Sequence, residues 1–335
     1  MRNILSAALV ASCFVSSAVA AERPGSLLVF PCFDNGRGAL TALTVTNTNS
    51  NTTSNGTLLA GTVDVEFVYI NGTNCAEFNR TRRLTPRDTI TVVTTLDNPN
   101  QVRGYAYVFA KSPTTGQAIK WDFLIGTETN VSLAFVGETE PWVFQAASAL
   151  GTGASTDVDM DGLRDLNGSE YTKAPDRLYV PRFWGALAPL GSLTLISLSP
   201  AQFTTVVDFL VHNDNEETFS AQYSFRCWTK TPLLEISNVF SSEFLATTNN
   251  NPNEVYIGNI GTMATGVSAV PETGWFQFDG SIAYSTAGQI QDPAILAFYC
   301  DAVLGFLPIG SQIPYVTGER GNGDLLGQSI FPDTN

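Results

Sequence analysis

Four carboxylates crowd into one short stretch of the chain, Asp157-Val158-Asp159-Met160-Asp161-Gly162-Leu163-Arg164-Asp165. At alternate or near-alternate positions these side chains repel one another unless a cation lies among their oxygens. Oxygen ligands at the first, third and fifth positions with a glycine at the sixth are typical of a calcium-binding loop. The pattern therefore predicts bound Ca²⁺, held by Asp157, Asp159, Asp161 and Asp165.

These nine residues resemble the Asp-rich repeat of thrombospondin type 3 and of related bacterial calcium linkers, D-x-D-x-D-G-x-x-D. The resemblance covers residues 157–165 only, and it implies a linker that calcium stiffens. An EF-hand loop would need a bidentate glutamate at its twelfth position, where this chain has Gly168 and the nearest carboxylate is Glu170. The last ligand is left open, and a solvated acidic linker without an ion is the alternative.

The composition predicts an extracellular β-protein. Hydrophobic residues make up 44% of the 335 residues, which is enough for a packed core, whereas charged residues make up only 14%. The formal net charge of -14 argues against nucleic acid binding, since the sequence has no Lys/Arg stripe to neutralise phosphates, and it disfavours adhesion to anionic lipid.

The first twenty residues predict a signal peptide. Arg2 supplies the positive charge, an apolar run follows, and Ala18-Val19-Ala20 offers a cleavage site. We expect the protein to be secreted, periplasmic or on the outer cell surface, and a lipidated Cys13 is the alternative. No later run reaches the ~20 apolar residues of a membrane helix, so we expect no transmembrane segment.

Short segments rich in Val, Thr, Phe and Tyr alternate with turns that contain Asn, Gly and Pro, which predicts an all-β protein. The expected strands are 40–46, 63–70, 89–95, 103–110, 118–125, 192–198, 205–212, 219–228, 254–257, 275–284 and 295–299. Their number and spacing predict two tandem antiparallel β-sandwich domains that are Ig-like in architecture. The Cys-Trp-Cys arrangement of immunoglobulins is absent from the sequence.

Three pairs of similar segments indicate an internal duplication. Residues 28–33 recur as 178–183, residues 94–100 as 247–253, and residues 115–119 are echoed by 286–290. The predicted organisation is a signal peptide at 1–20, a sandwich at 21–138, a linker with the calcium loop at 139–176, a second sandwich at 177–310, and a loosely ordered tail at 311–335.

An even number of cysteines remains after the signal peptide, which in an exported chain predicts disulfides with three possible connectivities. Cys75 and Cys227 follow matching strands, while Cys32 and Cys300 lie on the first and last strands of their halves. Each sandwich should therefore close its own bond, Cys32 with Cys75 and Cys227 with Cys300.

The residues offer little support for catalysis. His212 is the single histidine and there is no G-x-S-x-G motif, so we expect no enzyme. Paired carboxylates are the machinery of glycoside hydrolysis, and those eligible by type are Asp64, Glu66, Asp208 and Glu235.

We therefore expect an exported, non-catalytic structural or adhesive surface protein with a calcium-stiffened linker. The alternative is a carbohydrate-binding module or a glycoside-active enzyme, because aromatic residues at 11% could stack on sugar rings as well as fill a core. The expected partners are a surface glycan or a protein, and exposed sheet edges would also permit self-association.

Overall fold

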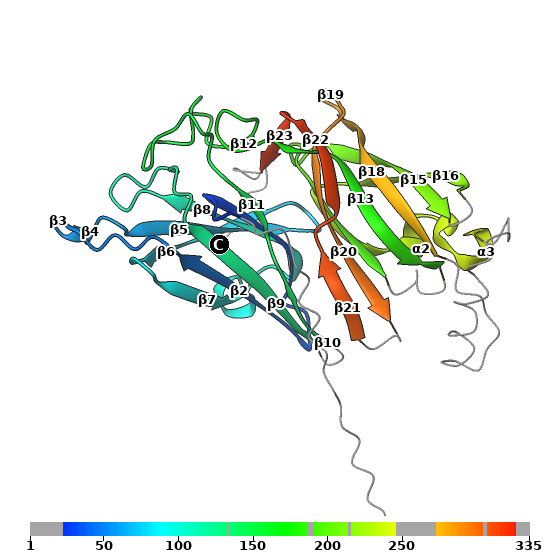
Figure 1. The fold of residues 1–335 in the computed structure, drawn as a ribbon, viewed down its shortest axis with the longest axis horizontal. Helices are drawn as coiled ribbons and strands as arrows, with labels where there is room; N and C mark the ends of the chain where they lie inside the picture. Colours follow the sequence, from blue (N-terminus) through cyan, green and yellow to red (C-terminus); the bar gives the residue numbers. More distant parts are fainter. Residues whose placement is uncertain are drawn as a thin grey trace, which may run out of the picture.

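The chain forms two β-sandwiches that lie side by side (Figure 1). The computed structural model describes residues 23–132, 135–185, 191–213, 216–245, 273–303 and 307–325. The predicted signal peptide at 1–20, Cys13 and the expected strand at 254–257 lie outside the described residues.

The first sandwich has a five-stranded and a four-stranded sheet, with strand orders β11-β1-β8-β5-β6 and β10-β9-β2-β7. The five strands of the larger sheet are Trp142–Phe144 (β11), Leu27–Asp34 (β1), Arg103–Lys111 (β8), Val63–Asn71 (β5) and Glu77–Leu84 (β6). The four of the smaller sheet are Phe135–Thr139 (β10), Leu124–Ser132 (β9), Ala39–Asn47 (β2) and Thr89–Val93 (β7). A small hairpin, Ser54–Asn55 (β3) with Leu58–Leu59 (β4), and one helical turn, Thr94–Asp97 (α1), complete it.

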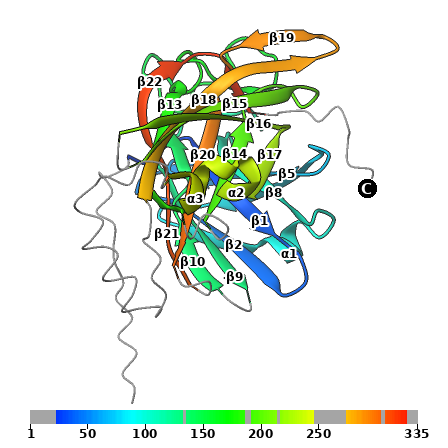
Figure 2. The ribbon, with the colours of Figure 1, turned by 90° about the vertical axis from the view of Figure 1, so that its right-hand side faces the viewer.

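The second sandwich has the sheets β16-β15-β18-β13-β22, with β19 paired to β18, and β17-β14-β20-β21 (Figure 2). The larger sheet consists of Thr218–Phe225 (β16), Thr204–Asn213 (β15), Thr273–Ser285 (β18), Ala174–Trp184 (β13), Tyr315–Arg320 (β22) and Gly288–Gln291 (β19). The smaller sheet consists of Trp228–Pro232 (β17), Ser192–Ser197 (β14), Ile295–Val303 (β20) and Leu307–Gln312 (β21). Three helical turns follow β17, namely Leu233–Ile236 (α2), Asn238–Phe240 (η2) and Ser242–Leu245 (α3).

The two sandwiches share one strand order, since β1, β8, β5 and β6 correspond in chain order and in position in the sheet to β13, β18, β15 and β16. The ladder shifts register at the same point in each, between Phe30 and Phe33 and between Val180 and Phe183. A proline follows the first residue of each shift, and proline has no N–H to donate to a ladder. This equivalence agrees with the similarity of 28–33 to 178–183, while the internal duplication itself stays a prediction.

The prediction of an all-β antiparallel sandwich fold is confirmed, but the order of the strands is not that of an immunoglobulin domain. In the first sandwich, the connections β1 to β2, β6 to β7 and β8 to β9 all cross from one sheet to the other. Immunoglobulin strands A and B, D and E, and F and G instead share sheets. The crossing connections are those of a jelly roll.

A third apolar core lies between the sandwiches, in addition to the core inside each. Leu27 and Val29 of β1 face this interface, whereas Leu28 and Phe30 face the interior of the first sandwich. From the other side, Ile196, Leu296 and Phe298 face Leu27 and Val29 in the same core. The five-stranded sheet of the first sandwich and the β17-β14-β20-β21 sheet of the second therefore pack face to face.

Two tryptophans fasten this interface with side-chain hydrogen bonds. Trp142 donates from Nε1 to the Ala297 carbonyl (3.1 Å), and its ring meets Phe298 edge-on. Trp228 donates from Nε1 to the Pro31 carbonyl (2.8 Å) in the first sandwich.

The predicted linker at 139–176 needs correction, because β11 belongs to the first sandwich. Direct packing of the two sandwiches, and not a connector, sets the spacing of the two domains.

The predicted disulfide pairs are wrong. Cys75 is bonded to Cys227, with a Cα–Cα distance of 5.9 Å, so neither is available to Cys32 or Cys300. Cys75 follows β5 and Cys227 precedes β17, and the interface brings these two turns together. The prediction assumed that each sandwich closes its own bond, whereas the actual bond joins the two sandwiches. Cys32 is a buried thiol, and its burial raises its pKa to about 12.

The predicted loose tail at 311–335 is also wrong for its first half. Residues 315–320 form β22 at the edge of the larger second sheet. Gly323–Leu325 (β23) pairs with Arg164–Leu166 (β12) from the predicted linker. Leu325 is fully buried in the core between the sandwiches, so this segment is anchored by packing.

Removing the disulfide by Cys75→Ser with Cys227→Ser should lower the free energy of unfolding by about 4–5 kcal/mol, because the bond closes a long loop in the unfolded chain. Urea unfolding measures the effect. Reductant should bring the unmodified protein to the stability of the double variant and leave the variant unchanged. A peptide map that joins Cys32 to Cys75 would contradict the structure.

Truncating the interface by Phe298→Ala should destabilise the protein by about 3–5 kcal/mol, because Phe298 is 2% exposed in the shared core. The two sandwiches should still unfold in a single transition, observed by calorimetry. Leu96→Ala, at a side chain that is 81% exposed, is the control and should change stability by no more than about 0.5 kcal/mol. Two separate transitions in the unmodified protein would refute the cooperative interface.

Candidate cation-binding site

The acidic loop lies between β11 and β13 and is fixed at both ends of its Asp-rich part. Thr156 at its start bonds through its hydroxyl to the Tyr171 hydroxyl (2.9 Å). At its end, β12 pairs with β23. Gly162, the sixth residue of the motif, has φ +83°, a conformation that strains residues with a Cβ. The turn that a calcium loop requires at this glycine is therefore present.

The four predicted ligands come together in two overlapping groups. Carboxylate oxygens of Asp157, Asp159 and Glu170 lie within 4.8 Å of one another, and so do those of Asp159, Asp161 and Asp165. Asp159 belongs to both groups. The structure thus brings the four predicted aspartates together. It also adds Glu170, which the sequence analysis had named only as the carboxylate nearest to the twelfth position of the loop.

Glu170 is the buried member of the cluster, with 1% of its surface exposed. Its two carboxylate oxygens accept hydrogen bonds from the backbone N–H groups of Val158 (2.6 Å) and Asp165 (3.2 Å). Burial raises the pKa of Glu170 to about 7, although the two N–H bonds act in the opposite direction. Glu170 therefore closes the loop by joining its two ends.

Asp324 is a sixth carboxylate that the sequence analysis missed, because it lies in the segment predicted as a loose tail. It is opposite Asp165 in the β12–β23 ladder. Burial, followed by the charges of Asp165 and Asp161, raises the pKa of Asp324 to about 8. Within the described residues, Oδ1 of Asp324 and Oδ1 of Asp157 are buried without a hydrogen-bond partner. Two further oxygens at this site thus lack the partner that buried polar atoms normally have.

Arg164 carries the positive charge within the loop, and this charge partly offsets those of Asp165 and Glu170. The Arg164 guanidinium donates to the Gly162 carbonyl (2.7 Å) and lies over the Phe109 ring, 4.7 Å from its centroid. Lys173, beyond the loop, pairs with Glu319 (3.9 Å). The site offers only oxygen donors and an excess of negative charge, which suits a hard cation such as Ca²⁺ or Mg²⁺.

The residues considered for catalysis have structural partners. His212 stacks on Trp275, with ring centroids 4.0 Å apart. Asp64 pairs with Arg83, and Glu66 with Lys111, on the first sandwich. Asp208 accepts from Gln222 (2.8 Å) and Glu235 from Thr231 (3.3 Å) on the second.

Comparison with known proteins does not identify the chain. No protein-family model matches it, and no similar protein was found among curated proteins. Among solved structures, the one described as the crystal structure of Thermotoga maritima 1070 aligns over 39% of this chain and 98% of its own, with 10% identity and a TM-score of 0.26. A TM-score this low does not indicate a common fold. Among the described residues, no helix has the length and apolar character to cross a membrane.

With divalent cations removed by a chelator, the free energy of unfolding should fall as the pH rises from about 5 to about 8. The folded protein keeps protons on Glu170 and Asp324 up to pKa values of about 7 and about 8, whereas in the unfolded chain these groups lose them near pH ~4. The folded state therefore binds more protons in this window, and stability decreases with pH. Urea unfolding at each pH gives the slope.

Asp324→Asn should make that slope shallower, because it removes one of the two groups. Glu140→Gln, at an exposed glutamate outside the loop, should leave the slope as it is. A slope that Asp324→Asn does not alter would contradict the raised pKa of this carboxyl.

Proposed function

We propose that the protein is an exported, non-catalytic structural or adhesive surface component that binds calcium in the loop 157–170. The observation that carries the proposal is the pair of overlapping carboxylate groups that share Asp159 and include the buried Glu170. A cation there would neutralise charges that the fold holds together beside an apolar core.

Calcium is favoured over other metals by the donor set and by the loop. Every candidate ligand is a carboxylate, with no thiolate or imidazole in either group, and this favours Ca²⁺ or Mg²⁺ over zinc or copper. Ca²⁺ takes six to eight oxygens in flexible geometry, whereas Mg²⁺ demands a near-ideal octahedron. The two carboxylate groups share Asp159 and together offer more than six oxygens without octahedral symmetry, which suits the larger ion.

A structural or adhesive role is supported by how the chain is stabilised. The two sandwiches are joined by an apolar interface and by a disulfide, a bond that persists in oxidising compartments. The carboxylates and the histidine considered for catalysis serve in ion pairs, hydrogen bonds and stacking. Since the interface already fixes the spacing of the domains, we assign the cation a local role, which is to hold β12 and β23 against the edge of that interface.

A carbohydrate-binding role remains the second candidate, and one observation favours it. The larger sheet of the second sandwich exposes aromatic residues, with Tyr315 69% and Trp275 38% exposed. Exposed flat rings on a rigid sheet are suited to stacking on sugars.

Adding Ca²⁺ to chelator-treated protein should raise its stability by about 2.7 kcal/mol at a concentration one hundred times the dissociation constant. Thermal melting and isothermal titration calorimetry measure the effect. Asp159→Asn should abolish the stabilisation because Asp159 belongs to both carboxylate groups. Mg²⁺ at equal concentration should stabilise the protein less.

Glu140→Gln is the matched control and should keep the full response to calcium. Equal melting temperatures in chelator and in Ca²⁺ would refute the calcium site. A response that persists in the Asp159→Asn variant would show that the ion binds elsewhere.

A further inference from the structure

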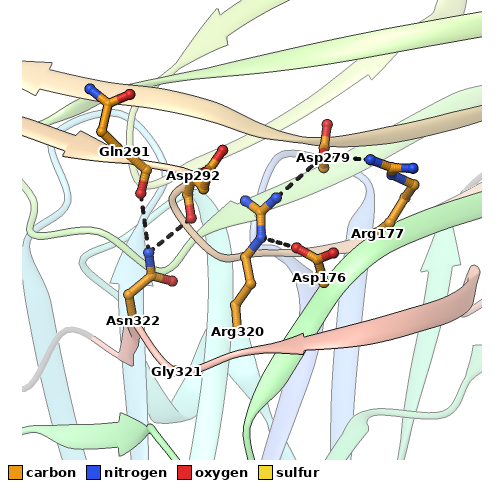
Figure 3. A pocket seen from close by; sticks show the side chains of 8 residues that line it. All are labelled: Asp176, Arg177, Asp279, Gln291, Asp292, Arg320, Gly321 and Asn322. Atoms are coloured by element: carbon orange, nitrogen blue, oxygen red, sulfur yellow. Dashed lines mark hydrogen bonds and ion pairs between the residues drawn. The ribbon is translucent and has the colours of Figure 1, made fainter.

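A pocket of about 560 Å³ opens at the end of the second sandwich, and it is distinct from the carboxylate cluster. Its walls come from β13, β18, the end of β19 with the following turn, and the end of β22 with the two residues after it (Figure 3). The volume lies within the range of small-molecule sites. Unlike most such sites, it is lined by charged and amide side chains.

The charges on the floor of the pocket are paired with one another. Arg320 pairs with Asp176 and with Asp279 (3.2 Å), and Arg177 pairs with Asp279 (3.7 Å). The Arg320 side chain is only 10% exposed and also donates to the carbonyls of Gly280 (2.7 Å) and Pro293 (3.1 Å). These groups are therefore held in place before any ligand arrives.

The rim supplies fixed polar groups at the mouth of the pocket. Asn322 donates from Nδ2 to the carbonyls of Gln291 (3.4 Å) and Asp292 (2.8 Å), which locks its amide (Figure 3). Its Oδ1 points toward the side of Arg320 in Figure 3. Asp292 is exposed at the rim, and its φ of +47° marks a tight turn that fixes its position.

With three carboxylates and two guanidinium groups, the charges of the pocket nearly cancel, so a strongly charged ligand of either sign gains little attraction. An anion would meet the carboxylates of Asp176, Asp279 and Asp292, and a cation would meet the guanidinium groups of Arg177 and Arg320. A neutral ligand with many hydroxyl groups can donate to the carboxylates and accept from the guanidinium groups without desolvating a charge of its own.

Aromatic rings adjoin the pocket on the outer face of the same sheet. Tyr179 lies two residues beyond Arg177 on β13 and is paired in register with Tyr315 on β22. The Tyr179 hydroxyl bonds to the Thr317 hydroxyl (3.1 Å), which orients its ring, and Tyr315 is 69% exposed. A chain of sugar rings leaving the pocket along β13 would meet these two rings.

We propose that this pocket and the adjoining Tyr179 and Tyr315 bind a neutral saccharide. The inference rests on the proposed adhesive role and names its ligand class. The paired charges and the locked Asn322 amide contact the hydroxyl groups of one sugar ring, and the tyrosines stack on the next.

The test uses the full-length protein, saturated with Ca²⁺, on an array of neutral oligosaccharides (glucans, mannans, xylans and galactans) alongside sulfated, uronic acid and chitosan oligomers. We expect binding to at least one neutral oligosaccharide. Isothermal titration calorimetry with that sugar should show affinity reduced about 3- to 10-fold by Tyr315→Ala and by Asn322→Ala. Both side chains are exposed, so the melting temperature of these variants should stay unchanged.

Matched controls are Tyr284→Ala, an exposed tyrosine outside the pocket lining, and Asn79→Ala on the first sandwich, and both should bind normally. No binding, binding to charged oligomers only, or affinity unaffected by both pocket variants would overturn the inference. The experiments distinguish this inference from the calcium site. A protein that calcium stabilises but that binds no sugar would refute this inference alone. A protein that binds the sugar but does not respond to calcium would refute only the calcium site.

Discussion

The apolar contact between the two sandwiches is the interaction on which the rest of the structure depends. It buries the second face of β1 and β8, so these strands are apolar on both sides and could not face water in a separate domain. It brings the turns of Cys75 and Cys227 within bonding distance. The two sandwiches thereby share one continuous apolar core.

The same contact between the sandwiches determines the surroundings of the acidic loop. Leu166, Tyr171 and Leu325, which flank its carboxylates, belong to the core between the sandwiches. The loop is therefore held against a low-dielectric region, and this burial is why the carboxyl groups of Glu170 and Asp324 keep their protons so readily. A divalent cation there would reduce the electrostatic cost of holding several carboxylates together beside an apolar core.

Much of the fold and part of the site were predictable from local sequence. Alternation in β2, β5, β15 and β18 marked these strands, and the Asp-Gly spacing marked a loop whose carboxylates do converge. What could not be predicted depends on contacts distant in sequence. Nothing near Asp324 indicates that it lies opposite Asp165, and no local pattern links Cys75 to a cysteine in the other sandwich. The helical turn α1, which begins at Thr94 and overlaps the end of the strand expected at 89–95, was also missed.

The pairing of β12 with β23 has a consequence for how the acidic cluster is completed. In chain order, Asp324 follows the strands of both sandwiches in the part of the chain that the structure describes, whereas its neighbours in the acidic cluster precede the second sandwich. The early carboxylates therefore gain their last acidic neighbour only when β23 pairs with β12. Closing this corner of the molecule therefore requires the C-terminal residues 323–325, and an incomplete chain leaves β12 without its partner strand.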